Sequence, residues 1–393
     1  LVRRTDAPTT PIAEDDPWVI LYTSGTTGRP KGCITTHRGT IGQVQGIVHN
    51  FLLAALMRAS GAVEAPGGIP GAPTSPPVTL LTSPLFHVAG LHATVCASMT
   101  AGAKLVFGPP KFEPEEVMRI IEKERVTTWM AIPTLLQRLL DHPKLGAYDL
   151  SSLNSISTGG APASPELLAR ARAMLPARPP AGTTYGLTET HGMATSIDGV
   201  EAESRPGSVG RPMPTVEVKI IDEAGNALER EVSGEILLSG PTLTPGYWKR
   251  PEATAETLRD GWLYTGDIGY LDQDGYLYII DRAKDMILRG GENVYCVEIE
   301  NCLADHPEIV EAAVIGIPDR DLGEKVKAVV RRAEGSHLDS AAVQAHVAAR
   351  LARFKVPEVV AFTDEPLPRN PAGKILKNLL RGTVINAVNM PNV

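Results

Sequence analysis

A stretch near the start of the sequence combines the residue types that bind phosphate groups. It reads YTSGTTGRPKG and spans residues 22–32, where Gly25 and Gly28 would let backbone amides approach an anion. Four hydroxyl side chains add hydrogen-bond donors: Thr23, Ser24, Thr26 and Thr27. Lys31 adds a positive charge. Because the spacing differs from GxxxxGKS/T, we predict a phosphate-binding loop outside the Walker type, against the alternative of an exposed turn.

Five further motifs follow along the chain. They are STGGAP (157–162), TTYGLTET (183–190), GEILLSGPTLTPGYWKRPEAT (234–254), GWLYTGDIGYLDQDGYLYIIDRAKDMI (261–287) and PRNPAGKILK (368–377). In this order, the set resembles the adenylate-forming superfamily of acyl- and aryl-CoA synthetases, non-ribosomal adenylation domains and luciferases. The resemblance is strongest to fatty-acid and other acyl-CoA synthetases. It covers nearly the whole chain, from Trp18 to Lys377.

The resemblance implies a nucleotide site around the second of these motifs. Tyr185, followed by Gly186, would place its ring against adenine, and Thr188 would contact the α-phosphate. Glu189 would bind Mg²⁺, an ion that takes hard oxygen ligands and typically uses one or two carboxylates plus phosphates. Outside such a motif, a single glutamate in a loop would be read as solvated.

Other motifs would complete the nucleotide site. Gly159, Gly160 and Ala161 would border the adenine and the acyl pocket, although alone they indicate only a turn. Asp267 would accept hydrogen bonds from both ribose hydroxyls, since an ionised carboxylate has about four lone-pair sites. Arg282 would make a second ribose contact, where the ordinary alternative is a surface arginine.

Two side chains are implied near the reacting carboxylate. Lys374 would meet the negative charge that builds between the carboxylate and the α-phosphate, although an isolated lysine there would be read as solvated. His87 resembles a family position near the substrate carboxylate or the pocket mouth. The acid is already ionised at neutral pH, so no general base is required. Packing or gating is therefore at least as reasonable a role for His87.

The implied reaction has two steps and needs ATP, Mg²⁺ and coenzyme A. A carboxylic acid reacts with ATP to give acyl-AMP and pyrophosphate, and the coenzyme A thiol then takes the acyl group and releases AMP. The apolar stretches LFHVAGLHATVC and TTWMAIPTLL favour a fatty or other hydrophobic acid. Alternatives are a carrier-protein thiol or oxygen as the acceptor, and a non-catalytic nucleotide-binding fragment.

The elements that must position these residues follow from periodicity. Apolar runs that predict strands, at 18–22, 78–82, 104–107 and 126–131, alternate with amphipathic segments such as 113–125. This alternation predicts βαβ units. Ser164 and Pro165 predict a helix start, as N-cap and first helical residue. The Asp274-Gly275 pair lies between two strand-like runs and predicts a hairpin.

The resulting fold class is α/β, with a large multi-subdomain N-terminal domain and a small mobile α+β C-terminal domain. The expected boundaries are 1–281 for the large ATP- and acyl-binding domain (with a β-rich part at about 210–281), 282–284 for a hinge and 285–393 for the lid. The hinge would centre on Lys284, and rotation would bring the Gly290-Gly291 turn to the site to admit the thiol. Since the phosphate loop comes so early, the sequence is expected to lack an N-terminal segment.

Composition excludes several classes of protein. Over 393 residues, a net charge of −7 gives no electrostatic footprint for nucleic acid, and 43% hydrophobic residues exclude general disorder. Four cysteines without a CxxC pair are expected to be reduced thiols in a cytoplasmic protein: Cys33, Cys96, Cys296 and Cys302. No transmembrane run of about 18 apolar residues occurs. The expected partners are a small carboxylic acid and coenzyme A, with a homo-oligomer left open.

Overall fold

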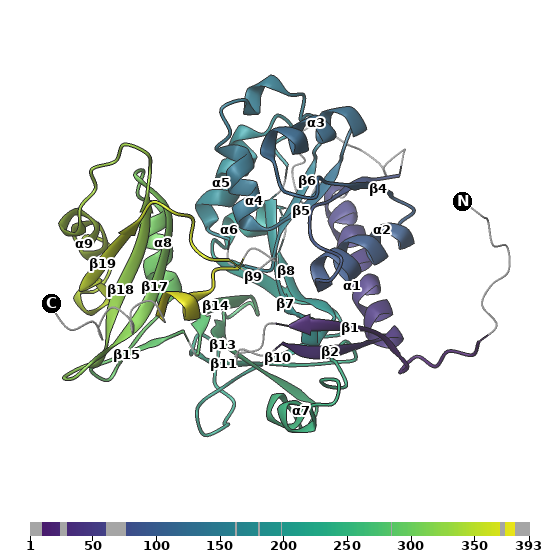
Figure 1. Cartoon of the computed structure of the whole chain (residues 1–393). Coiled ribbons are helices and arrows are strands. Elements are labelled where there is room, and N and C mark those ends of the chain that lie inside the picture. Colours follow the sequence, from purple (N-terminus) through teal and green to yellow (C-terminus); the bar gives the residue numbers. More distant parts are fainter. Residues whose placement is uncertain are drawn as a thin grey trace.

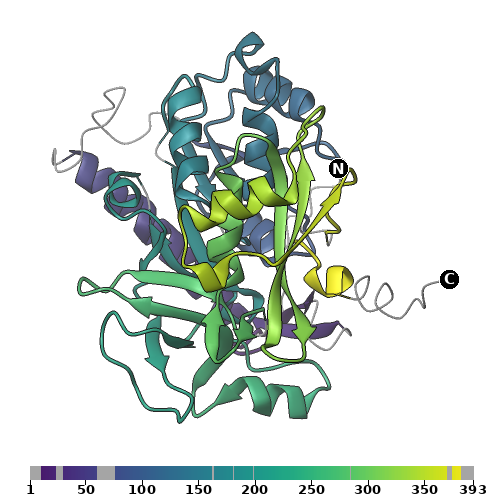
Figure 2. The same cartoon turned by 90° about the vertical axis from the view of Figure 1, so that its left-hand side faces the viewer.

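The computed structural model describes residues 10–23, 30–59, 76–161, 163–179, 181–197, 199–283, 285–369 and 374–381. Figures 1 and 2 show a large body and a smaller one, which carries the C-terminal part of the chain. Lys284 of the expected hinge lies outside the described residues. No helix in the described ranges has both the length and the hydropathy to cross a bilayer.

One twelve-stranded sheet runs through the large body. Its order is β10-β11-β13-β14-β9-β8-β7-β6-β5-β3-β4, with β12 on β13. The parallel strands are β3 (Val78–Leu81), β4 (Lys104–Phe107), β5 (Thr128–Ala131), β6 (Ser155–Thr158) and β7 (Ala181–Leu187). The antiparallel strands are β8 (Gly192–Ile197), β9 (Ser208–Pro212), β10 (Glu217–Ile221), β11 (Gly234–Ser239), β12 (Leu258–Arg259), β13 (Trp262–Leu271) and β14 (Leu277–Arg282). The sheet therefore changes from parallel to antiparallel between β7 and β8.

The parallel half has the expected βαβ build. Three helices pack beside it: α3 (Pro114–Glu124), α4 (Pro133–Leu140) and α5 (Pro165–Met174). Their apolar faces share a buried core with Trp129 of β5 and Ile156 of β6. Ser164 caps α5 as expected, because its hydroxyl accepts a hydrogen bond from the Leu167 amide at 3.2 Å. The large body also contains η1 (Ala89–Cys96, a π-helix), α2 (Ala97–Thr100), η2 (Leu145–Ala147), η3 (Thr188–Thr190), α6 (Gly199–Ser204) and α7 (Pro251–Thr257).

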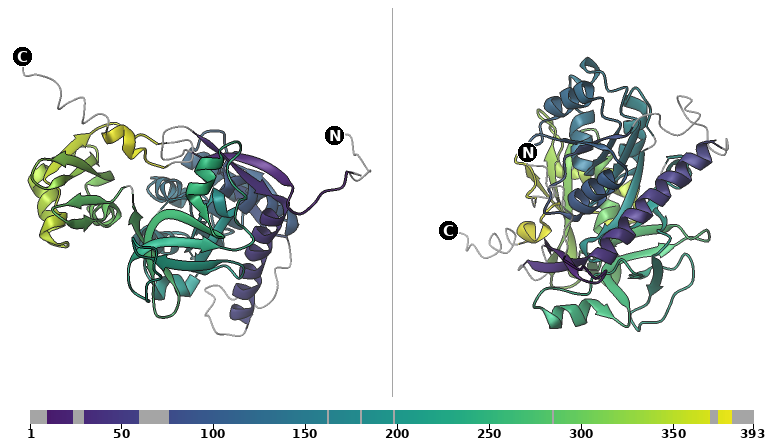
Figure 3. Two further views of the ribbon diagram at one scale, coloured as in Figure 1. Left: turned by 90° about the horizontal axis from the view of Figure 1, so that it is seen from below. Right: turned by 90° about the vertical axis from the view of Figure 1, so that its right-hand side faces the viewer.

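A separate ladder flanks the predicted phosphate loop. Strands β1 (Pro17–Thr23) and β2 (Lys31–Thr36) pair antiparallel. The ladder is fastened to the segment after β11, because the Ile34 amide donates to the Gly246 carbonyl at 3.0 Å and the Trp248 amide donates to the Gly32 carbonyl at 2.7 Å. Helix α1 (His37–Ala59), which was not predicted, then runs along one side of the large body (Figure 3).

The small body is α+β, as predicted. Its sheet has the order β16-β15-β18-β17, with β19 parallel to β18. The elements are β15 (Ile287–Arg289), β16 (Glu292–Val294), α8 (Cys296–Ala304), β17 (Ile309–Asp319), β18 (Gly323–Arg332), α9 (Ser340–Ala348), η4 (Arg353–Lys355) and β19 (Val359–Thr363). Its core is its own, formed by residues such as Ile299, Val326 and Val343. Helix α9 ends at Ala348.

Candidate active site

The ends of the predicted phosphate loop are held by the β1–β2 ladder. Thr23 and Lys31 are cross-strand partners at the last and first positions of the two strands. The predicted nucleotide-binding residues between them, Ser24, Gly25, Thr26, Thr27 and Gly28, lie outside the described residues. The ammonium of Lys31 lies 4.9 Å from the centroid of the Tyr247 ring, so this lysine faces the segment after β11.

Glu189 reaches the same tyrosine from another direction. It lies in η3, directly after β7, and its Oε1 accepts a hydrogen bond from the Tyr247 hydroxyl at 2.6 Å. The Glu189 carbonyl also accepts from the Thr244 amide at 2.7 Å. Thr188 begins the same turn, and its carbonyl accepts from the His191 amide at 3.0 Å. Lys31 and Glu189 are 158 positions apart in the sequence, and both contact the side chain of Tyr247.

The donor set at Glu189 fits a magnesium ion bound together with a nucleotide. Among the described residues, no group of three or more His, Cys, Asp and Glu side chains could form a metal cage. Mg²⁺ sites on nucleotides need no cage, because one or two carboxylates and the phosphates supply the oxygens. With Oε1 bonded to Tyr247, Glu189 retains Oε2 as an anionic ligand without a hydrogen-bond partner in the described part of the chain.

Asp267 lies at the centre of a second cluster. Its side chain is 4% exposed, and its Oδ2 accepts a hydrogen bond from the Tyr185 hydroxyl at 2.7 Å. The Arg282 Nε lies 3.0 Å from its other oxygen, Oδ1, since the two residues are cross-strand partners on β13 and β14. Burial, together with the Asp267 charge, raises the pKa of Tyr185 well above its usual range, so the hydroxyl stays a donor. The predicted ribose-binding pair therefore lies beside the predicted adenine-binding ring.

Strand β7 joins this cluster to a cavity, because successive side chains of a strand point to opposite faces. Thr184 lines the cavity, whereas the hydroxyl of the next residue, Tyr185, meets Asp267. Gly186 follows, at a point where β7 and β8 approach closely. A Cβ atom there would lie 1.7 Å from the Gly192 carbonyl oxygen, so no larger residue fits without a shift of the backbone.

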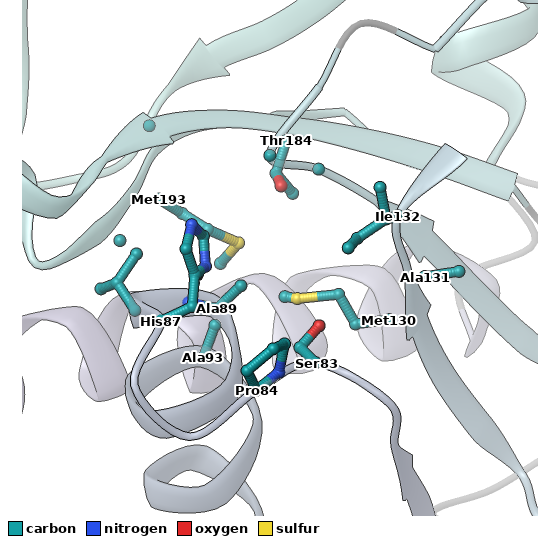
Figure 4. A pocket seen from close by; sticks show the side chains of 15 residues that line it. Ser83, Pro84, His87, Ala89, Ala93, Met130, Ala131, Ile132, Thr184 and Met193 are labelled. Carbon is teal, nitrogen blue, oxygen red and sulfur yellow. Dashed lines mark hydrogen bonds between the residues drawn. The ribbon is translucent and has the colours of Figure 1, made fainter. Parts of the chain in front are cut away.

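The cavity is shown in Figure 4. Its lining comes from the loop before η1, from η1, from the end of β5 and the residue after it, from the turn after β6, and from β7 and β8: Ser83, Pro84, His87, Val88, Ala89, Ala93, Met130, Ala131, Ile132, Gly159, Gly160, Thr184, Gly186, Gly192 and Met193. The two apolar stretches expected at a pocket both contribute. In the described residues, no Asp, Glu, Lys or Arg lines the cavity, and Ala161 is not part of its lining.

His87 offers the cavity a hydrogen-bond donor. Its Nδ1 accepts a hydrogen bond from the Ala89 amide at 3.2 Å, so the proton of the neutral ring is on Nε2. Burial lowers the pKa of His87 below its ordinary value, which favours this neutral form. His87 therefore suits a polar contact with an acid at the pocket wall better than it suits a permanent positive charge.

Lys374 lies on a segment attached to both bodies. Arg369, which forms a backbone bridge with Ile375, donates to Glu311 of the small body at 2.9 Å and to the Thr134 hydroxyl of α4 at 3.3 Å. Three residues beyond Lys374, the ammonium of Lys377 forms an ion pair with Glu300 of α8 at 2.8 Å. In the sequence, Lys374 is thus flanked by residues that attach to α4 and to α8.

Sequence reasoning missed the role of His191. Its Nε2 accepts from the Thr36 amide at 2.8 Å, and its Nδ1 lies 2.7 Å from the Thr242 carbonyl. The Nδ1 atom must therefore carry the proton, and the buried ring ties β2, η3 and the segment after β11 together. Burial lowers the pKa of His191 to about 4, which keeps the ring neutral. The only sequence signal for His191 is that it stands two positions after Glu189.

Family models and relatives identify the family to which this chain belongs. Residues 2–248 match the AMP-binding enzyme family, and residues 298–374 match the AMP-binding enzyme C-terminal domain. Feruloyl-CoA synthase of an Amycolatopsis species is 38% identical over 376 residues, which cover 96% of this chain and 72% of that protein. Long-chain-fatty-acid–CoA ligase of Bacillus subtilis (strain 168) is 38% identical over 370 residues, which cover 93% of this chain and 62% of that protein.

A solved structure shares the architecture. The crystal structure of ATP-bound MatB from Rhodopseudomonas palustris superposes with a TM-score of 0.78 at 35% identity, covering 95% of this chain and 69% of that one. The chain therefore belongs to the AMP-binding enzyme family, and it is an AMP-forming acid–thiol ligase of the adenylate-forming superfamily.

Proposed function

We propose that this protein activates a hydrophobic carboxylic acid with ATP and transfers the acyl group to coenzyme A. One observation carries the proposal: an apolar cavity adjoins, through β7, the Tyr185–Asp267–Arg282 cluster. Acid and nucleotide would thus meet at a single strand. The Met130 and Met193 side chains in the cavity, and the lack of Asp, Glu, Lys or Arg among its described lining residues, support an uncharged acyl group.

In the first step, a carboxylate oxygen forms a bond to the α-phosphorus of ATP and the bond to the β-phosphate breaks, giving acyl-AMP and pyrophosphate. Catalysis is mainly positioning and charge neutralisation. Asp267 and Arg282 would hold the ribose, and the ring of Tyr185 would lie against adenine. Magnesium, when bound, neutralises phosphate charge, and the residue that would hold it is Glu189.

Cationic and polar groups would bind the phosphates and the developing negative charge in this step. Lys31 and its loop, which includes Thr23, would bind the departing pyrophosphate, and Thr188 would contact the α-phosphate. Lys374 would meet the charge that develops between the carboxylate and the α-phosphate. The contact of Arg369 with Thr134 supports delivery of Lys374 from the small body, because it docks the lysine-bearing segment on the large body. The Nε2–H group of His87 would donate a hydrogen bond to the acid.

In the second step, the coenzyme A thiol loses its proton to water and its sulfur bonds to the acyl carbon. The bond from that carbon to the phosphate oxygen breaks, and AMP leaves with its electron pair. The small body would first turn about the residues around Lys284 and bring the Gly290-Gly291 turn towards the site. Both glycines have positive φ, +59° and +89°, in the tight turn between β15 and β16. Such a turn leaves room for a thiol to approach.

The test is ATP–pyrophosphate exchange with a panel of aliphatic, aromatic and dicarboxylic acids, followed by thioester formation with coenzyme A or with a phosphopantetheinylated carrier protein. We expect exchange with uncharged aliphatic or aromatic acids and acyl transfer to coenzyme A. Preference for a dicarboxylate would overturn the substrate class. Transfer only to the carrier protein would overturn the acceptor, and nucleotide binding without exchange on any acid would favour a non-catalytic role.

A further inference from the structure

Tyr247 contacts two groups at once that the proposed reaction uses. Its hydroxyl donates to Glu189 Oε1 at 2.6 Å, and its ring faces the Lys31 ammonium, which lies 4.9 Å from the ring centroid. The side chain is 8% exposed, so it is held between these partners and does not project into solvent. None of the roles assigned above to the motif residues involves Tyr247.

The backbone around Tyr247 is fixed to both partners independently of its side chain. The Thr244 amide donates to the Glu189 carbonyl at 2.7 Å, and the Trp248 amide donates to the carbonyl of Gly32, next to Lys31, at 2.7 Å. The Tyr247 amide itself donates to the Thr254 hydroxyl at 2.9 Å. The ring therefore reaches Lys31 and Glu189 from a rigid base, which is the requirement for holding other groups in place.

The two contacts have different physical effects. A carboxylate that accepts a hydrogen bond on one oxygen loses rotational freedom, so the direction of its other oxygen becomes fixed. Burial and the Glu189 charge raise the pKa of Tyr247, and the hydroxyl therefore remains a donor at neutral pH. The face of an aromatic ring attracts an ammonium group, which restricts the long side chain of Lys31.

We propose that Tyr247 is a positioning residue that sets the direction of the Glu189 metal-binding oxygen through its hydroxyl and the place of the Lys31 ammonium through its ring. This inference rests on the proposed function, in which Glu189 binds the metal ion and Lys31 binds phosphate. It predicts that hydroxyl and ring can be separated by experiment. Tyr247→Phe removes only the hydroxyl, whereas Tyr247→Leu removes both features.

The first readout is binding, measured by calorimetry with Mn²⁺–ATP and with ATP in EDTA. For Tyr247→Phe we expect Mn²⁺–ATP to bind about tenfold more weakly, since the hydrogen bond to a charged group is lost, and ATP in EDTA to bind as before. Tyr247→Leu should also weaken binding of inorganic pyrophosphate, through Lys31. If Tyr247→Phe weakened ATP binding equally with and without metal, the proposal would be overturned. Unchanged binding in both variants would also overturn it.

Tyr276 provides a matched control. Its hydroxyl donates to Glu201 Oε1 at the same 2.6 Å, it is 4% exposed, and the Arg205 guanidinium lies 4.1 Å from its ring centroid. Tyr276→Phe therefore removes an equivalent hydrogen bond away from the site. It should lower stability about as much as Tyr247→Phe but leave Mn²⁺–ATP affinity unchanged. A similar loss of Mn²⁺–ATP affinity in both variants would show a merely structural effect and overturn the proposal.

A double-mutant cycle with Glu189→Gln separates this inference from the proposed function. If Glu189 binds the metal and Tyr247 acts through it, Tyr247→Phe has no further effect on Mn²⁺–ATP binding in the Glu189→Gln background. An undiminished effect there overturns the positioning role alone. If Glu189→Gln by itself leaves Mn²⁺–ATP binding intact, the metal role given to Glu189 is wrong, and the hydroxyl part of the inference falls with it.

Discussion

The hydroxyl of Tyr185 lies 2.7 Å from Oδ2 of Asp267, and both side chains are buried. Arg282 occupies the other oxygen of the carboxylate, with its Nε at 3.0 Å. Each oxygen has a second lone-pair site, so ribose hydroxyls would add to this arrangement without displacing either partner. The pair thus links the proposed adenine contact to the proposed ribose contact.

Asp267→Asn should weaken the binding of ATP by about tenfold or more, because hydrogen bonds to a charged acceptor are lost. The affinity for 2′,3′-dideoxy-ATP should change little, since that nucleotide has no hydroxyl for the carboxylate to bind. Calorimetry with both nucleotides measures the difference. Equal weakening of the two would contradict the ribose role and indicate that Asp267 only supports Tyr185 and Arg282.

Lys374→Ala should reduce ATP–pyrophosphate exchange by at least about 100-fold, because a cation is removed where charge develops in the first step. Thiolysis of a pre-made acyl-adenylate should be spared. Both rates are measured on the same preparation, with Lys111→Ala as a control, because the Lys111 side chain is 89% exposed and pairs with Glu113 at the surface. Equal loss of both half-reactions would refute this division of labour.

Ala93→Phe should narrow the acid specificity. Ala93 lines the cavity from η1, opposite the β5 side that carries Met130 (Figure 4). A phenyl ring there would fill space that the acyl group needs, so kcat/KM for large acids in the exchange assay should fall more than about tenfold. Activity with acetate and the KM for ATP should stay near the original values. A uniform decline across all acids would argue against this cavity as the acyl pocket.

His191 should make the fold sensitive to acid. Its pKa is lowered from 6.5 to about 4, so between these values the unfolded chain binds more protons than the folded chain. Stability is therefore lost as the pH falls from about 6.5 towards 4, by up to about 3 kcal/mol. His92, whose ring stacks on His191 at a centroid distance of 5.8 Å, also has a lowered pKa and contributes in the same direction.

The measurement is urea unfolding at pH 7, 6 and 5 for the original protein and for His191→Gln. The variant should be less stable at pH 7, because the hydrogen bonds with Thr36 and Thr242 are disturbed, but its stability should fall less steeply with pH. Since His92 is present in both proteins, the difference in slope reports on His191. Parallel curves would contradict the assignment.

Much of the fold followed from local sequence patterns. Strand β4 was predicted at its observed bounds, and α5 starts at Pro165 after its Ser164 cap, because apolar period and capping are local properties. Helix α1 was missed. Its glycines lower helix propensity, and its conformation depends on distant packing: a Cβ on Gly39 would lie 2.3 Å from the His191 ring. That contact joins residues 152 positions apart, so no sequence pattern near Gly39 indicates it.

The site divides in the same way. Motif resemblance assigned Glu189 and Asp267 to one nucleotide site, and residue types assigned Lys31 to a phosphate loop, but neither gave the contacts that hold these side chains. Tyr247 joins Lys31 to Glu189, and His191 joins Thr36 to Thr242. Asp267 is instead joined to Tyr185 and Arg282. These contacts exist only when the chain has folded, because their partners lie far apart in the sequence. The partners of the His191 ring are also backbone groups, which residue type does not encode.

Strand β7 carries the proposed acid-facing and nucleotide-facing side chains on adjacent residues, Thr184 and Tyr185. Inserting or deleting one residue before them would reverse which face each occupies. Substitution of Thr184 can therefore change the acid preference, whereas an insertion or deletion in this strand would disrupt both sites. Variation in acid preference among relatives should accordingly arise with the length of β7 held constant.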